Sequence, residues 1–206
     1  MNKTIELIGN HVSIREYTDE KIKEETLKYI LEKAQYASTS SFLQAYTVIR
    51  VNNESMRKKI SELSGEQAYI EKASDFLVFC ADLKRLSDAS ERHGKEAKKG
   101  YTEMFIISTV DTALYAQNVM LAAESLGIGG VFIGGIRNNP DKICQLLNIP
   151  DEIYPVFGMC LGYPAQKVGS KLRLPIDVVV KEEIYSEDNI ESMLQYDEKI
   201  RTYYQE

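Results

Sequence analysis

Residue types that build many catalytic and structural sites are scarce in this chain. Its 206 residues include no tryptophan, two histidines (His11 and His93) and three cysteines (Cys80, Cys144 and Cys160). The cysteines are odd in number, form no CxxC pair and lie near neither histidine in the sequence. We therefore expect neither a structural zinc site nor a disulfide framework. Reduced thiols in apolar segments indicate a cytoplasmic protein.

Membrane-spanning runs and an excess of positive charge are also missing. The longest apolar-rich stretch, 104–126, is interrupted by Asp111 and Glu124, so we expect no membrane span. The first ten residues are too polar for a signal peptide. Lysine and arginine (25) are outnumbered by aspartate and glutamate (31), and the net charge of −6 argues against general nucleic-acid binding.

Familiar catalytic motifs are absent as well. The sequence has no P-loop, no GxSxG nucleophile elbow and no HExxH zinc motif. Gly127 and Gly129 begin like a dinucleotide-binding loop, but Phe132 stands where that motif requires glycine, and the segment runs from a helix to a strand. A Ser-His-Asp triad would need His11 or His93, and His93 lies in a charged segment expected to face solvent.

Apolar periodicity predicts an α+β fold. A chain of this length buries about 70% of its surface on folding, so we expect one domain over residues 1–206. Strands are predicted at 46–51, 76–81, 130–133, 156–161 and 176–180. Helices are predicted at 2–9, 19–37, 54–63, 65–72, 101–126, 140–147 and from 186 onward, with Asp19, Asn139 and Ser186 as N-caps. Because strands and helices alternate irregularly, the sheet is expected to be mixed and flanked by helices.

The predicted helix at 101–126 is rich in alanine and apolar almost all round. A helix of this kind is normally buried on every side. A single domain of this size rarely encloses so long a helix, so we expect a second subunit to cover part of it.

Two separated segments alternate in a way that would suit an anion. In 11–15 an extended backbone places His11, Ser13 and Arg15 on one side. In 170–175 the same alternation pairs Lys171 with Arg173. Together these groups would suit a phosphate dianion, which guanidinium binds bidentately. From the pattern alone, two unrelated edge segments with outward charges are the alternative.

Other segments offer groups for a planar heterocycle. Residues 38–41 read Ser-Thr-Ser-Ser and provide small hydrogen-bonding groups, or else form a hydroxyl-rich loop. Gln67 is able to read an amide edge, although a surface glutamine is the plainer interpretation. Gly134 and Gly135 follow a predicted buried strand. They either let backbone N–H groups approach a ligand or form a tight turn.

In their order along the chain, these segments resemble the FMN-dependent nitroreductase superfamily, specifically its oxygen-insensitive NADPH nitroreductase and flavin reductase branch. The matching stretches are HxSIR at 11–15, SxSSFLQ at 38–44, GxQ at 65–67, VFCAD at 78–82, DTA at 111–113, AQN at 116–118, AAESLG at 122–127, IGGIRN at 133–138, FGxCLG at 157–162, KxRLP at 171–175, QYD at 195–197 and YY at 203–204. Each is weak alone, but a chance match of the whole series is not credible.

The resemblance implies a nitroreductase-like homodimer with two FMN molecules at the subunit interface and the long helix in the dimer core. The residues implied to bind the cofactor are His11, Ser13, Arg15, Ser38, Thr39, Ser41, Gln67, Ile133, Gly134, Gly135, Lys171 and Arg173. Phe42, offered by the partner subunit, and Tyr69 are implied to line the substrate space. No metal is expected.

The activity that the resemblance implies is FMN-dependent oxidoreduction. NADPH or NADH would transfer a hydride to flavin N5, and two electrons would then pass in a ping-pong cycle to small-molecule oxidants such as nitroaromatics, quinones, azo compounds or free flavin. No catalytic side chain is required, because the cofactor carries the chemistry. The alternatives are a flavin-binding sensor or carrier without turnover and a structural dimer without cofactor.

Three departures from the family pattern bear on these expectations. Val12 stands where the family usually has arginine, and Thr39 replaces the more usual serine. The branch normally continues past the paired tyrosines with an arginine-rich tail thought to engage the NADPH phosphate, and this sequence ends at Gln205-Glu206. The family's tail is thus expected to be absent, which leaves the choice between NADPH and NADH open.

Overall fold

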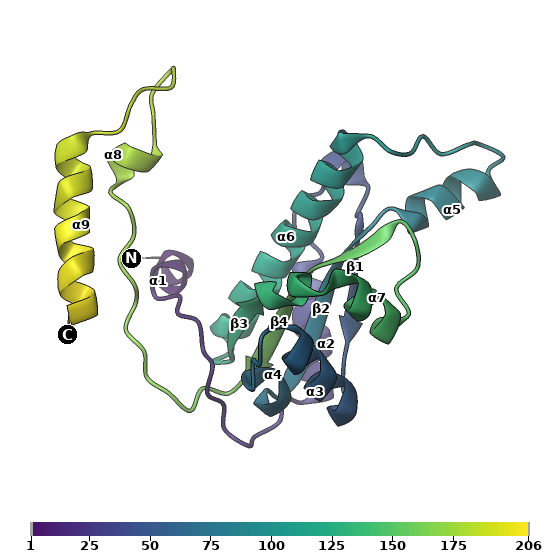
Figure 1. Ribbon diagram of the computed structural model, residues 1–206, viewed down its shortest axis with the longest axis horizontal. Coiled ribbons are helices and arrows are strands. Elements are labelled where there is room, and N and C mark those ends of the chain that lie inside the picture. The colour runs from purple at the N-terminus through teal and green to yellow at the C-terminus, as the bar shows by residue number, and fades with distance from the viewer. Residues whose placement is uncertain (1, 206) are drawn as a thin grey trace. The chain divides into compact units, whose positions relative to one another are not determined.

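Residues 2–205 are described by a computed structural model of the protein, drawn in Figure 1. They form two compact units, the first ending at Val168 and the second beginning at Gly169. The expectation of one domain over residues 1–206 stays a prediction. No helix in the described part of the chain combines the length and the apolarity needed to cross a bilayer.

The first unit is built on a four-stranded sheet with the order β1-β2-β4-β3. Its strands are β1 (Tyr46–Arg50), β2 (Asp75–Asp82), β3 (Gly129–Ile133) and β4 (Ile153–Gly162). All three pairings within residues 2–205 are antiparallel. The α+β class is confirmed, but a mixed sheet is wrong for these residues. Strands that run in the same direction are always separated by one that runs the opposite way, so no parallel pair forms.

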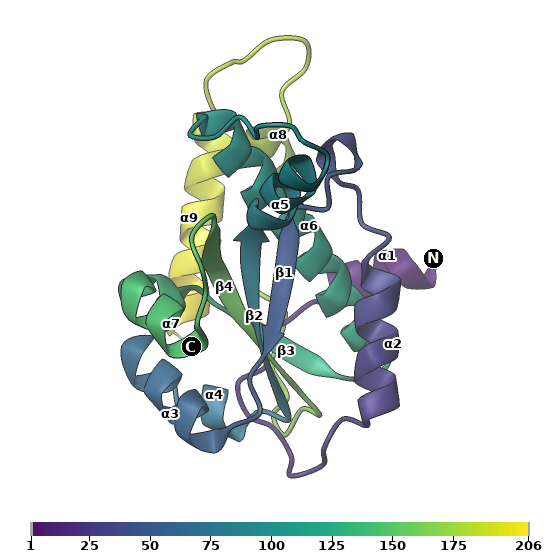
Figure 2. The ribbon, with the colours of Figure 1, turned by 90° about the vertical axis from the view of Figure 1, so that its right-hand side faces the viewer.

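Helices cover both faces of this sheet (Figure 2). The helices of the described part of the first unit are α1 (Lys3–Gly9), α2 (Glu24–Ala34), η1 (Ser40–Phe42), α3 (Glu54–Leu63), α4 (Tyr69–Lys72), α5 (Lys84–Arg92), α6 (Thr102–Ser125), η2 (Gly134–Asn138) and α7 (Pro140–Leu147). Leu77 and Phe79 of β2 pack under α2 and α6, while Phe76 and Val78 pack under α3, α4 and α7. Alternate residues therefore face opposite cores, and the whole strand is buried, as its continuous apolar run predicts.

Of the two helix caps predicted in the first unit, one is wrong and one is confirmed in position. Asp19 does not cap α2, because Ile22 enters the core and the helix begins only at Glu24. Asn139 stands at the N-cap position of α7 with Pro140 after it, but its side chain makes no cap hydrogen bond, and its Nδ2 donates to the carbonyl of Leu63 at 2.9 Å. In both cases a tertiary contact replaces the local one that the sequence suggests.

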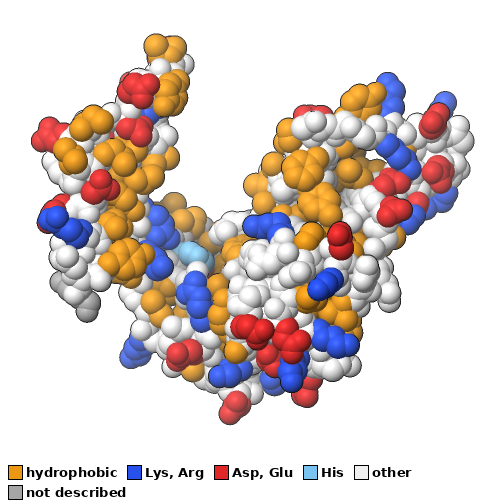
Figure 3. Space-filling view, in the orientation of Figure 1, with side chains coloured by type: hydrophobic (Ala, Val, Ile, Leu, Met, Phe, Trp, Pro, Cys, Tyr) orange, Lys and Arg blue, Asp and Glu red, His pale blue; other side chains and the backbone are white. Residues whose placement is uncertain are grey.

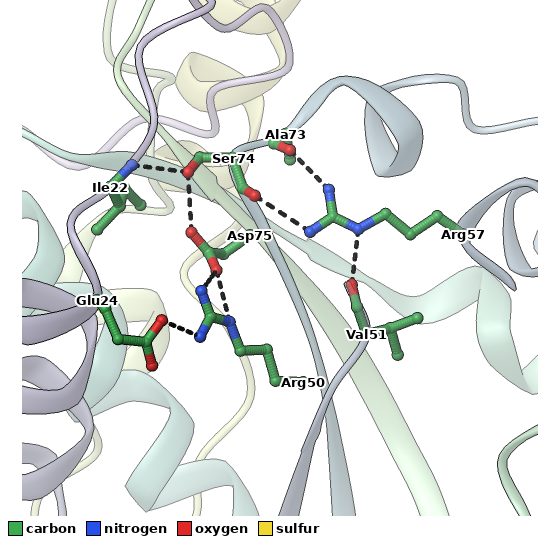
Figure 4. Close-up of polar contacts among 8 residues, drawn as sticks. All are labelled: Ile22, Glu24, Arg50, Val51, Arg57, Ala73, Ser74 and Asp75. Atoms are coloured by element: carbon green, nitrogen blue, oxygen red, sulfur yellow. Dashed lines mark hydrogen bonds and ion pairs between the residues drawn. The ribbon is translucent and has the colours of Figure 1, made fainter. Parts of the chain in front are cut away.

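A network of polar contacts lies at the end of the sheet where β1 ends and β2 begins (Figure 4). Arg50 Nε donates to Asp75 Oδ1 at 2.8 Å, and Arg50 Nη1 lies 2.5 Å from Glu24 Oε2. Arg57 is buried, and burial lowers the pKa of its guanidinium. Its N–H groups donate at 2.7–3.1 Å to the carbonyls of Val51, Ala73 and Ser74. These bonds attach the chain that leaves α4 to the sheet.

The long helix α6 has two apolar sides with different surroundings. One side, which includes Tyr115, is buried against the sheet and α2. The other exposes Phe105, Ile106, Val110 and Leu114, each 42–56% accessible. Figure 3 shows hydrophobic side chains gathered where this helix lies in Figure 1. The expected burial of the helix therefore holds for one of its sides, and its cover by a second subunit stays a prediction.

The second unit contains α8 (Ile176–Val179) and α9 (Ile190–Gln205). A strand at 176–180 is wrong: the backbone turns, and the N–H of Val180 donates to the carbonyl of Ile176 at 2.8 Å. Its β-branched residues favour a strand only where a neighbouring strand can pair with them. Ser186 is not the cap of α9, because Asn189 Oδ1 accepts the N–H of Glu191 at 3.0 Å.

Candidate functional site

The segment 11–15 runs in extended conformation beside the start of β3. The N–H of Ile14 donates to the carbonyl of Gly130 at 2.9 Å, and the Ile14 side chain is buried. A Cβ atom at Gly129 would lie 2.5 Å from Ile14 Cγ1, so glycine permits this close approach. Arg15 is exposed and Ser13 is half-buried. Of the two residues expected to face the core, Ile14 does so, while Val12 is half-buried like His11 and Ser13.

An acid of α6 holds the histidine of this segment. His11 Nδ1 lies 2.5 Å from Glu124 Oε1, and the Glu124 side chain is only 11% exposed. The other carboxylate oxygen, Oε2, is buried without a hydrogen-bond partner in the described structure. With Nδ1 turned to a carboxylate, Nε2 is the nitrogen left for a ligand.

The backbone around Arg15 is held by a side chain that the sequence analysis did not single out. Gln166 Oε1 accepts the N–H groups of Arg15 and Glu16 at 2.6 and 2.8 Å. Among the described residues, the Arg15 guanidinium makes one weak contact, with the carbonyl of Ser13 at 3.5 Å, and it pairs with no carboxylate. An exposed guanidinium on a fixed backbone is well suited to bind an anion.

A second group of predicted residues meets at the end of β3. A Cβ atom at Gly135 would lie 2.2 Å from the carbonyl oxygen of Ser64 and 2.7 Å from Gln67 Nε2. Gln67 Nε2 donates to that carbonyl at 2.9 Å, and the hydroxyl of Tyr69 donates to Gln67 Oε1 at 2.7 Å. Ile133 is fully buried, so only its backbone can reach a ligand. The fold thus brings Gln67, Tyr69 and Gly135 together.

The hydroxyl-rich loop 38–44 is held from α6 by a buried acid. The N–H of Ser40 donates to Asp111 Oδ1 at 2.9 Å, and the N–H of Ala45 donates to Asp111 Oδ2 at 3.2 Å. Thr39 Oγ1 accepts the N–H of Gln44 at 2.8 Å. The Thr39 hydroxyl oxygen is therefore an acceptor within the loop, and its O–H remains able to donate.

Other side chains of this loop are open to solvent. Ser38 and Ser41 are exposed, and Phe42 is 79% exposed. Phe42 makes no aromatic contact with another described residue. A large apolar side chain presented this way is available to a ligand or to another chain.

Helix α6 separates these two parts of the candidate site. Asp111, which holds the loop 38–44, and Glu124, which holds His11, are thirteen residues apart on the helix. At a rise of 1.5 Å per residue this corresponds to about 20 Å. One chain therefore does not bring the hydroxyl loop next to the segment 11–15.

Lys171 and Arg173 belong to the second unit, outside any helix or strand. Arg173 Nη1 donates to the carbonyl of Lys171 at 2.9 Å and to that of Leu172 at 3.3 Å. Both side chains are exposed, and neither pairs with a carboxylate of the described residues. Their charges are free to meet an anion.

The cysteines do not supply a reactive thiolate. All three are free. Burial raises the pKa of Cys80 to about 12 and also raises the pKa values of Cys144 and Cys160. These thiols stay protonated near neutral pH, where a protonated thiol is a poor nucleophile.

A cavity of about 600 Å³ has none of the predicted cofactor residues in its lining. Apolar residues such as Leu83, Leu86 and Met104 line it, together with His93 and the segment that follows α5. Leu43 of the hydroxyl-rich loop forms part of its wall. Nothing in the sequence analysis assigned this cavity a ligand.

Sequence reasoning missed Asp111, Glu124 and Gln166. The first two carried a usable signal, because they interrupt an otherwise apolar helix, and a buried acid needs hydrogen-bond donors. Gln166 carried none, since a glutamine in a polar loop is unremarkable in a sequence.

Known proteins resemble this chain over most of its length. Residues 8–163 match the sequence profile described as "Nitroreductase family". The chain belongs to the nitroreductase family. This family member is 44% identical to a Bacillus subtilis protein named "FMN reductase (NADPH)", over 100% of its own length and 85% of that relative. It is 41% identical to a Salmonella typhimurium protein named "Oxygen-insensitive NADPH nitroreductase", over 99% and 83% of the two chains.

Solved structures agree on the fold of this nitroreductase. A Vibrio harveyi NADPH:FMN oxidoreductase, solved in complex with NAD+, superposes with a TM-score of 0.94 at 41% identity, covering 99% of this chain and 87% of that one. Nitroreductase A from Vibrio parahaemolyticus also gives 0.94, at 42% identity, covering 99% and 85%. The resemblance inferred from the motifs and the nitroreductase-like α+β fold are confirmed.

Proposed function

We propose that this nitroreductase is an FMN-dependent enzyme that passes electrons from NADPH or NADH to nitroaromatic, quinone or flavin acceptors. The names of its relatives support the cofactor and the donor class, because they include FMN reductases and NADPH nitroreductases at 41–44% identity. The observation that carries the proposal is the segment 11–15, in which Arg15 presents an exposed guanidinium on a backbone held by Gln166 and His11 is held by Glu124.

The residues present fit the phosphate of FMN. Arg15 has no competing carboxylate among the described residues, and the backbone beneath it is fixed by Gln166. We propose that Arg15, His11 and Ser13 bind the phosphate. Lys171 and Arg173, which are exposed and unpaired in the second unit, stay predicted phosphate ligands. A dianion needs such charge-assisted donors, which are stronger than neutral ones.

The residues at the end of β3 fit the isoalloxazine ring. Because Gly135 lies against the carbonyl of Ser64 with no room for a side chain, backbone rather than side chain would meet the ring there. The proposed contacts to the ring and ribityl chain come from Ser38, Thr39, Ser41, Gln67, Ile133, Gly134 and Gly135. The Tyr69 hydroxyl orients the Gln67 amide, and Tyr69 and Phe42 would line the substrate space.

When bound, FMN supplies a hydride-accepting N5 atom and two-electron redox chemistry. The chain's own residues would then bind and orient the cofactor and exclude water from it. None of them is required as a nucleophile. The protonated thiols described above agree with that division of labour. A donor and an oxidant that use one binding face in turn would give ping-pong kinetics.

A homodimer would complete the site. The two acids that hold the loop 38–44 and the segment 11–15 lie about 20 Å apart along α6, while α6 exposes an apolar side made of Phe105, Ile106 and Val110. We propose that two chains pack through this side and form two FMN sites, each using residues of both chains. Phe42 would then be offered to the partner's site. We also propose a cytoplasmic location, since the cysteines are unpaired.

Anaerobic stopped-flow reduction of FMN-loaded protein tests this function and the donor. NADPH or NADH is expected to bleach the visible flavin bands, and the faster nucleotide is the preferred donor. Re-oxidation by a quinone should follow in a second mixing step. If neither nucleotide bleaches bound FMN, the chain binds flavin without acting as an oxidoreductase and the proposed activity is wrong.

A further inference from the structure

The loop 38–44 adopts a conformation that its own sequence does not favour. Ser41, Phe42 and Gln44 have φ angles of 47°, 59° and 52°. This left-handed region is unfavourable for residues other than glycine. Three such residues within four positions persist only if contacts outside the loop hold them.

Asp111 provides the first of those contacts. Its two carboxylate oxygens accept the N–H groups of Ser40 and Ala45, which flank the left-handed residues on either side. The carboxylate is 1% exposed and forms no ion pair with any of residues 2–205. A buried charge needs hydrogen-bond donors, so the acid and the loop each depend on the other.

Arg85, which lies on α5, bonds to the chain where the same loop meets β1. Its Nη1 donates to the carbonyl oxygens of Gln44 and Tyr46 at 3.3 and 3.0 Å, and its Nη2 donates to Thr47 Oγ1 at 2.7 Å. The loop is thus held by a buried acid through two N–H groups and, at its last residue, by a half-exposed guanidinium that bonds to the carbonyl of Gln44 and to two residues of β1. Phe42 lies in the sequence between Ser40 and Gln44, which these two residues bind, and its own side chain is exposed.

We propose that Asp111, assisted by Arg85, is a positioning residue that sets where Phe42 stands in the substrate space. This inference rests on the proposed function and extends it, because it assigns acceptor binding to a residue that touches no ligand. Asp111 acts on the backbone at both ends of the loop, so the direction of the aromatic ring follows from it. The acceptor class affected is flat and aromatic, because such molecules stack on a ring.

The test is a double-mutant cycle between Asp111→Asn and Phe42→Ala. Asparagine keeps one acceptor oxygen and turns an NH₂ group toward the other N–H, so the loop loses one anchor. We expect the KM for a naphthoquinone to rise by about tenfold, the lower end for losing a hydrogen bond to a charged group, with little change in the rate of flavin reduction. In the Phe42→Ala background, Asp111→Asn should add no further increase.

Additive effects of the two substitutions would overturn the proposal, because they would mean that Asp111 acts other than through Phe42. An unchanged KM in soluble, folded Asp111→Asn protein would overturn it as well. Asp88→Asn is the matched control, since Asp88 is a half-exposed acid of α5 that pairs with Lys84 at 2.6 Å. It should leave both half-reactions unchanged.

Two further measurements keep the test decisive. Arg85→Gln loosens the loop from its exposed side and should raise the same KM even if Asp111→Asn does not fold. Amide hydrogen exchange needs no activity: exchange at Ser40 and Ala45 should be faster in Asp111→Asn than in wild type, and unchanged exchange would contradict the proposal. If the wild type is not reduced by either nucleotide, the proposed function fails, while the exchange result still decides the role of Asp111.

Discussion

The segment 11–15 and the loop 38–44 are both held by acids of α6, but in opposite ways. Glu124 holds the first through a side chain, His11, while the backbone N–H of Ile14 donates to the carbonyl of Gly130 in β3. Asp111 holds the second through two backbone N–H groups and leaves the Phe42 side chain free. An acid bonded to a side chain orients that one side chain, whereas an acid bonded to two backbone N–H groups constrains the conformation of the loop between them.

The largest expected effect is on stability, and it separates the two acids. Asp111→Ala leaves two N–H groups without partners, one of them in a buried residue, so we expect the free energy of unfolding to fall by about 3 kcal/mol. Glu124→Ala should cost about 1 kcal/mol, since His11 can still reach water. Urea unfolding monitored by circular dichroism measures both. Equal losses would mean that the two anchors do not differ as described.

A large effect on cofactor binding is expected at Arg15. Arg15→Ala removes a charge-assisted donor, and FMN binding should weaken by about 1.5–3 kcal/mol with little loss of stability. Quenching of flavin fluorescence on binding gives the dissociation constant. Arg92→Ala, which removes another exposed arginine of the first unit, is the control and should bind FMN as the wild type does. Unchanged affinity in Arg15→Ala would place the phosphate elsewhere.

A smaller effect is expected at the backbone anchor of the same segment. Gln166→Leu frees the N–H groups of Arg15 and Glu16, which are exposed and can bond to water instead. We expect FMN affinity to fall by about 1 kcal/mol, the net value of an ordinary hydrogen bond. The melting temperature should barely change, in contrast to Asp111→Ala. A large drop in melting temperature would show that this anchor is structural like the other.

The smallest effect is expected from Glu124→Gln. The carboxamide oxygen can accept the same hydrogen bond from His11 Nδ1, so only the negative charge is lost. FMN affinity should change by about 0.5 kcal/mol, measured by the same fluorescence titration. A loss as large as that of Arg15→Ala would mean that the charge of Glu124, rather than the position of His11, controls phosphate binding.

Local sequence patterns predicted the helices and strands of the core well, but they predicted some helix starts and the segment 176–180 poorly. The continuous apolar run of β2 and the bounds of α3 follow directly from periodicity. Errors arose where a tertiary contact competed with a local signal, as at Ile22, which is drawn into the core past the expected cap at Asp19. The expected strand at 176–180 is instead largely α8 (Ile176–Val179), and residues 169–205 contain no strand that could pair with it. For the site, the buried Ile14 and the exposed Arg15 of the segment 11–15 were predictable, but the residues that hold the segment were not.

The sequence by itself determined the α+β class, the buried strands, the anion-suited alternation of 11–15 and, through its motifs, the family. Only the tertiary structure decided which acid holds which segment, because Asp111 and Ser40 are 71 positions apart and no local pattern encodes such a contact. It also decided that the two acids which hold the parts of the site lie about 20 Å apart along α6 within one chain. A rigid helix of fixed rise sets that distance, and this separation is why we propose a site shared by two chains.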